Sequence, residues 1–112
     1  MSFSSEALRG HTETIILALL KNQDSYGYEI LKYINDKGNG RIDIKDATIY
    51  TAVKRMEKDG LITTYWGEGE DGGARRKYYS ITERGREYWK EKVDEWRELN
   101  VILNELIGGE QR

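Results

Sequence analysis

Two tight groups of basic side chains lie in the middle of this 112-residue chain, on either side of a glycine-rich segment. Arginine and lysine can neutralise DNA phosphates, and each such contact contributes about 0.9 to the logarithmic salt dependence of duplex binding. Alone, the first group is typical of a solvated helix surface. Together, the two groups favour a nucleic-acid-binding surface. They are Lys54/Arg55/Lys58 and Arg75/Arg76/Lys77.

Hydroxyl groups precede the first basic group at a spacing that places them on or beside the same helix surface. Threonine and tyrosine hydroxyls can donate hydrogen bonds to phosphates or meet base edges. At 100° per residue, Thr51 and Ala47 fall on the side of Lys54 and Lys58. The candidate DNA contacts are therefore Ala47, Thr48, Tyr50, Thr51, Lys54, Arg55, Lys58, Arg75, Arg76 and Lys77.

The residue types that catalysis and metal binding need are scarce. The chain has no cysteine and one histidine, His11, so thiolate sites and histidine clusters are excluded. No serine has a base partner beyond that histidine, and the carboxylates lack ligand spacing. We expect no enzyme, no metal and no cofactor. The first ten residues lack the form of a signal peptide and no apolar run approaches a membrane span, so we expect a cytoplasmic protein.

Helical periodicity predicts two helices in the first third of the chain. The first runs over about residues 5–20, with apolar side chains on one face. The second covers residues 26–35, with Asp24 or Ser25 as its N-cap. It ends at glycines 38 and 40.

The basic groups belong to a third helix and a β-hairpin. The helix begins near Lys45 or Asp46, buries the side that carries Ile49, Ala52, Val53 and Met56, and ends at Gly60 in a left-handed conformation. The strands are residues 61–66 and 76–81, rich in β-branched and aromatic side chains. Residues 67–75 form the glycine-rich tip, in which "EGED" is acidic. Of Tyr78 and Tyr79, strand alternation places one in the core.

A long last helix, capped by Thr82, covers residues 83–107 and measures about 37 Å at 1.5 Å per residue. Its apolar stripe runs almost the full length, which one small domain cannot cover, so a second copy of the chain is the expected partner. The alternative is that the helix folds back on its own domain. The predicted dimer interface is Trp89, Val93, Trp96, Leu99, Leu103, Leu106 and Ile107.

The expected fold class is mainly α with a small β-hairpin (α+β): a winged helix-turn-helix domain over residues 1–82 and a C-terminal dimerisation helix over residues 83–112. In this layout the third helix enters the DNA major groove and the hairpin contacts flanking backbone. The alternative is a winged-helix protein-interaction module without specific DNA binding. It draws on the net charge of −2 and the acidic hairpin tip.

Several segments together resemble the PadR family of bacterial transcriptional regulators, over residues 8 to 107. The C-terminal helix is short for the family. In this respect the chain resembles the small subfamily, which includes multidrug-sensing members. The segments are "LRGHTETIILALL", "DSYGYEILKYI", "DATIYTAVKRMEKDGLITTYW", "GGARRKYYSITERGRE" and "VDEW".

The resemblance implies a homodimeric repressor that binds double-stranded DNA at an inverted-repeat operator. It also implies a planar aromatic effector at the dimer interface, stacked on Trp96. By pattern alone, Trp96 is a residue that packs in the dimer interface. The bulky Trp89 side chains could fill the effector cavity that the resemblance implies at that interface. The effector-binding residues that the resemblance implies are Ala7, Thr14, Ala18, Trp89, Val93, Trp96 and Asn100.

Overall fold

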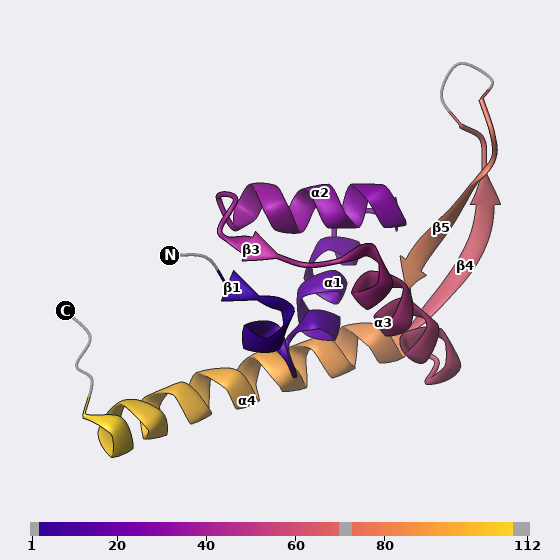
Figure 1. Cartoon of the computed structure of the whole chain (residues 1–112). Coiled ribbons are helices and arrows are strands. Elements are labelled where there is room, and N and C mark those ends of the chain that lie inside the picture. The colour runs from indigo at the N-terminus through magenta and orange to yellow at the C-terminus, as the bar shows by residue number, and fades with distance from the viewer. Residues whose placement is uncertain (1–2, 70–72, 109–112) are drawn as a thin grey trace.

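The computed structural model describes residues 3–69 and 73–108, and it confirms an α+β winged-helix fold (Figure 1). In the described residues, four α-helices and a small antiparallel sheet form the domain, together with a short 3-10 helix and two further short strands that pair in parallel. The elements are β1 (Phe3–Ser4), η1 (Ser5–Leu8), α1 (Thr12–Leu20), β2 (Ser25–Tyr26), α2 (Gly27–Lys37), β3 (Ile42–Asp43), α3 (Asp46–Lys58), β4 (Ile62–Gly67), β5 (Arg76–Ile81) and α4 (Glu83–Ile107).

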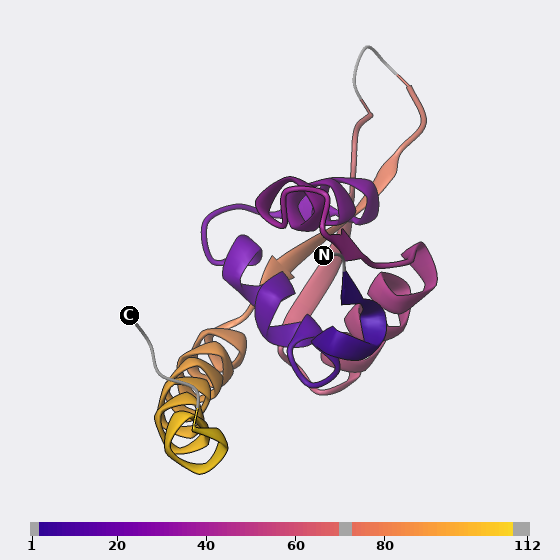
Figure 2. The same ribbon diagram turned by 60° about the vertical axis from the view of Figure 1, so that its left-hand side comes forward.

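The core lies where α1, α2 and α3 meet the base of the β4–β5 hairpin (Figure 2). Helix α1 is apolar on most sides and supplies four buried residues. Helices α2 and α3 each bury one stripe, which is the arrangement that their period-3.6 patterns predict. The largest fully buried apolar side chains are Ile16, Leu17, Leu20, Ile30, Ile49, Met56 and Ile62.

The first helix differs from its prediction, because residues 5–20 do not form one continuous helix. The chain makes the short helix η1, turns, and restarts as α1 at Thr12. Gly10 adopts a φ of +87°, a conformation that glycine tolerates and other residues rarely adopt. The turn at Gly10 therefore separates η1 from α1 as two distinct helices.

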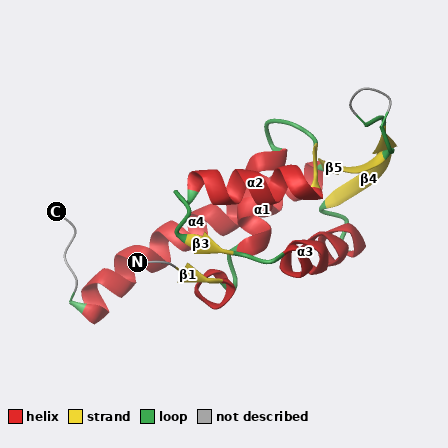
Figure 3. Ribbon diagram, turned by 45° about the horizontal axis from the view of Figure 1, so that its top comes forward, coloured by secondary structure: helices red, strands yellow, loops and turns green. Residues whose placement is uncertain are grey.

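The start of α2 also differs from its prediction. Its N-cap is Tyr26, and no side chain caps the helix. Ser25 does not act as a cap because it is buried in strand β2, which pairs antiparallel with β5 through Ser25–Tyr79 and Tyr26–Tyr78. The sheet therefore has three strands in the order β2-β5-β4 rather than two. Figure 3 shows its long strands, β4 and β5, side by side.

The boundary between α3 and the hairpin is as predicted. Gly60 has a φ of +78°, its N–H donates to the Glu57 carbonyl, and the N–H of Leu61 donates to the Met56 carbonyl. This pair of hydrogen bonds is a Schellman motif, which ends a helix and turns the chain sharply. Strand β4 therefore starts within a few residues of the end of α3, and we call the β4–β5 hairpin, residues 62–81, the wing.

Helix α4 has the predicted bounds and the predicted cap. The Thr82 hydroxyl accepts from the Gly85 N–H at 3.0 Å and donates to the Gly60 carbonyl at 2.7 Å. A Cβ on Gly85 would collide with the Leu61 carbonyl, so only glycine lets the first turn approach this closely. The helix then leaves the body, and the chain measures 54 × 32 × 22 Å. Among the described residues, no helix is long and apolar enough to cross a membrane.

Candidate nucleic-acid interface

Helix α3 divides into a buried side and an exposed polar side, as its sequence predicts. Ile49, Ala52, Val53 and Met56 are buried. The predicted DNA-contacting side chains of this helix all lie on the surface, Thr48 partly buried and the rest exposed. These are Ala47, Thr48, Tyr50, Thr51, Lys54, Arg55 and Lys58.

Arg55 differs from its two lysine neighbours because it has an acidic partner on another helix. Its Nη1 lies 3.3 Å from Oε2 of Glu13 on α1, and the Glu13 side chain is largely buried. The ion pair offsets the charge that Arg55 would otherwise present to a phosphate. Lys54 and Lys58 therefore carry the basic character of the outer surface.

The three basic residues on the returning side of the wing do not share one face. Lys77 is exposed and lies opposite Trp66 in the strand register, whereas Arg76 lies opposite Gly67. Arg76 places its guanidinium carbon 4.5 Å from the centre of the Tyr26 ring. Arg75 lies 6.0 Å from the centre of the Trp66 ring. The three cations are adjacent in the sequence, but Arg76 lies over Tyr26 whereas Arg75 and Lys77 both lie near Trp66.

Three tyrosines support the face of the wing that carries Arg76. Tyr78 stacks nearly parallel to Tyr65, with ring centres 5.6 Å apart, and meets Tyr26 edge-on at 5.5 Å. The Tyr65 hydroxyl donates to the Asp24 carboxylate at 2.6 Å, and this hydrogen bond raises the pKa of Tyr65. The wing is thereby fastened to the loop between α1 and β2. Tyr79, on the opposite face, is the core tyrosine, and burial raises its pKa.

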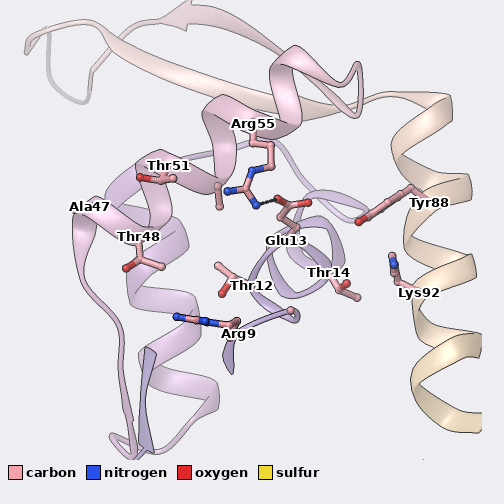
Figure 4. Close-up of a pocket in the computed structure, with 12 residues that line it drawn as sticks. Arg9, Thr12, Glu13, Thr14, Ala47, Thr48, Thr51, Arg55, Tyr88 and Lys92 are labelled. Carbon is pink, nitrogen blue, oxygen red and sulfur yellow. Dashed lines mark hydrogen bonds and ion pairs between the residues drawn. The ribbon is translucent and has the colours of Figure 1, made fainter. Parts of the chain in front are cut away.

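A pocket of about 590 Å³ lies between α1, α3 and α4 (Figure 4). The Glu13–Arg55 ion pair crosses it, and α4 closes one side with Tyr88 and Lys92. Hydroxyl groups from α1 and α3 line much of the remainder. The lining residues are Arg9, Gly10, Thr12, Glu13, Thr14, Ala47, Thr48, Thr51, Ala52, Arg55, Tyr88 and Lys92.

Of the residues expected to bind an effector, the structure places only Thr14 in the lining of this pocket. Trp89 packs against the core of its own chain, with the Lys21 ammonium 3.6 Å from its ring centre. Trp96 is 50% exposed on α4, beyond the body of the domain. The others also lie apart from the pocket lining: Ala7, Ala18, Val93 and Asn100.

The predicted dimer stripe changes from partly buried to exposed at about Trp96. Before it, Trp89 and Val93 are partly buried. After it, the apolar side chains are exposed, up to 76% for Leu106 and Ile107. The alternative of a helix folded back on its own domain therefore fits only the first half of α4. Val101 and Ile102, which the stripe omitted, are exposed as well.

Sequence reasoning missed three features of the interface. Glu13 gave no signal, because its partner lies 42 residues away. The sequence predicts Asp24 only as a helix cap, whereas its carboxylate accepts a hydrogen bond from Tyr65 of the wing. The sequence predicts Trp66 only as a strand residue, whereas the structure exposes its side chain beside the glycine-rich tip.

Comparison with known proteins identifies relatives among the PadR-like transcriptional regulators. The model of the transcriptional regulator PadR-like family matches residues 16–91. A transcriptional regulator from Clostridium thermocellum is 45% identical, with a TM-score of 0.82 over 92% of this chain and 96% of that one. A PadR family transcription regulator from Clostridium difficile is 35% identical, with a TM-score of 0.74 over 87% and 98%. An uncharacterized protein of Lysinibacillus sphaericus is 43% identical over 94% of this chain and 95% of its own length.

Proposed function

Because the chain belongs to the PadR-like family of transcriptional regulators, whose members bind DNA, we propose that it is a repressor that acts as a homodimer on an inverted-repeat operator. The family is one of transcription regulators, not of enzymes. The proposal goes beyond the family in three respects, which are repression, the homodimer and the symmetric DNA site. They rest on α3, the wing and α4.

The observation that carries the proposal is the position of the wing beside the exposed side of α3. The Schellman turn at Gly60 joins the two directly, and the Thr64 hydroxyl donates to Glu57 of α3 at 3.0 Å. A helix that presents Thr51, Lys54 and Lys58 can enter a major groove while the wing reaches the neighbouring backbone. The phosphate contacts position the protein, and the contacts to base edges select the sequence.

The second half of α4 supports the homodimer. A series of large apolar side chains is uncovered over the last three turns of this helix. A contiguous exposed apolar surface of this kind marks an interaction site, and two-fold dimers are the commonest soluble oligomers. A second copy of the chain would cover the stripe and place two α3 helices for half-sites about 34–36 Å apart.

An effector is a further part of the proposal, drawn from the resemblance to multidrug-sensing members. Trp96, half exposed on the same stripe, offers a ring on which a planar aromatic molecule can stack. The pocket between α1, α3 and α4 has the size of a small-molecule site, and Thr48 and Thr51 of its lining belong to α3. The test is tryptophan emission with a panel of planar aromatic cations. No response, together with unchanged operator release in Trp96→Ala, would remove this part of the proposal.

The first experiment is the selection of random duplexes by the full chain at near-physiological salt. We expect a two-fold symmetric site, and placing that site in a promoter should lower transcription of a reporter when the protein is present. In Lys54→Ala/Lys58→Ala, the logarithmic salt dependence of binding should fall by about 0.9 for each phosphate that is no longer neutralised. Lys32→Ala, which removes a cation paired with Asp36 on α2, is the matched control.

The alternative, a winged-helix module that docks on proteins, makes the opposite prediction. Recovery of no sequence above background, or an affinity for duplex that ignores salt, would favour that module. Recovery of an asymmetric single site would retain DNA binding and contradict the dimer.

A further inference from the structure

The two faces of the wing differ in what their side chains contact. Paired residues on neighbouring strands share a face, and faces alternate along each strand. One face carries three pairs, which are Thr63 with Ser80, Tyr65 with Tyr78 and Gly67 with Arg76. The other carries three pairs, of which Trp66 with Lys77 is the outermost; the inner two are Ile62 with Ile81 and Thr64 with Tyr79.

The first face is occupied by contacts within the chain. Tyr78 lies between Tyr65 and Tyr26, and the guanidinium of Arg76 lies over Tyr26. Asp24 accepts the hydrogen bond of Tyr65. These contacts explain Tyr65, Tyr78 and Arg76 as side chains that hold the wing to the body.

The second face begins in the core and ends on the surface. Ile62 and Tyr79 are buried, and Thr64 is bonded to Glu57 of α3. One pair further out, Trp66 is 59% exposed and faces an exposed Lys77. Beyond this pair the wing extends away from the helices of the body (Figure 1). A large aromatic side chain is thus held on the side of the wing that continues from α3, with a cation beside it.

We propose that Trp66 contacts DNA, with its indole ring packed against deoxyribose and base edges in the groove next to the one that α3 enters. Lys77 and Arg75 then pair with the phosphates on either side of the ring. The inference rests on the proposed function and names a contact within it. Apolar and aromatic side chains recur in minor-groove contacts, where they exclude water and fix the position of the protein.

Charge complementarity selects DNA as the occupant of this surface. Lys77 is exposed opposite the ring, and Arg75 already lies 6.0 Å from its centre. An indole with flanking cations matches a sugar–phosphate backbone, which alternates apolar deoxyribose with anionic phosphate. Trp66 contributes little to folding, because most of its surface is outside the core.

The test compares variants on the duplex that the full chain selects. Trp66→Ala should weaken binding about tenfold, because the apolar surface that the ring buries against the duplex is lost, and Trp66→Phe should retain most of the affinity. The salt dependence should stay unchanged in Trp66→Ala and fall by about 0.9 in Lys77→Ala. Thr63→Ala, an exposed residue of β4 on the other face, is the matched control and should bind as the unaltered chain does.

A second measurement follows the ring itself. In Trp89→Phe/Trp96→Phe, Trp66 is the only tryptophan, and saturating duplex should protect its emission from acrylamide quenching. If Trp66→Ala binds within about twofold of the unaltered chain and the emission stays accessible, this inference is wrong and the proposed function stands. If the unaltered chain binds no duplex, the proposed function fails, and the inference fails with it. Protection by a protein partner in place of DNA would likewise overturn the inference.

Discussion

The carboxylate of Glu13 on α1 lies 3.3 Å from the guanidinium of Arg55 on α3 and links the two helices across the pocket. Arg55 belongs to the basic group that the sequence assigns to DNA, yet its charge is offset from inside the protein. The pair joins the helix expected to enter the major groove to the helix at the centre of the core. DNA binding should therefore respond to a residue that lies behind the surface proposed to face DNA.

Replacing Glu13 by glutamine tests this link. Glu13→Gln keeps the shape and removes the charge, so Arg55 becomes available to a phosphate. We expect tighter duplex binding and a salt dependence steeper by about 0.9. Stability should change by less than about 1 kcal/mol, since Arg55 is largely exposed. Asp36→Asn, which breaks the exposed pair with Lys32, is the control. Weaker binding would show instead that the pair orients α3.

The hydrogen bond between Tyr65 and Asp24 predicts a dependence of stability on alkaline pH. Because this bond raises the pKa of Tyr65, its contribution is fully present below the ordinary tyrosine pKa of about 10 and is lost as pH rises through the raised value. Tyr65→Phe should therefore unfold at a lower temperature than the unaltered chain at about pH 8, and the two midpoints should converge above about pH 10. The raised pKa of Tyr79 is common to both proteins and cancels. A constant difference would contradict the assignment.

A charge on the exposed end of α4 should separate the proposed dimer. Leu106 is 76% exposed in one chain, so Leu106→Glu removes little packing within it. We expect a folded monomer by sedimentation and an operator affinity lower by about 100-fold, since two half-sites are no longer bound together. Glu98→Gln, also exposed on α4, is the control and should remain dimeric. A Leu106→Glu protein that stays dimeric would place the interface elsewhere.

The close approach of α4 to the wing predicts an intolerant glycine. In Gly85→Ala, the new Cβ would meet the Leu61 carbonyl oxygen and the Ile81 side chain, and backbone cannot move aside cheaply. We expect a decrease of about 1–3 kcal/mol in the free energy of unfolding, measured by denaturant titration. Glu87→Ala, exposed on the same turn region, should stay within about 0.5 kcal/mol of the unaltered chain. Equal stability of the two variants would contradict the contact.

The sequence by itself determined the helix boundaries at which a residue has a strong capping preference. Gly60 ends α3 through its left-handed backbone, and Thr82 starts α4 through its hydroxyl, so both boundaries follow from residues within one turn. The alternation in residues 76–81 predicted β5, and the 3.6-residue period predicted the buried side of α3. The α+β winged-helix fold follows from that order of elements.

Tertiary structure alone decided the contacts between distant segments. Ser25 is a strand residue because β5 lies beside it and pairs with it. Over so short a segment, the sequence does not distinguish a helix cap from a strand. Glu13 meets Arg55, and Asp24 meets Tyr65, across 42 and 41 residues of chain. Trp89 turned inward and Trp66 outward, although both belong to amphipathic patterns. Periodicity specifies which side chains share a face, whereas the packing of the whole chain determines which face is covered.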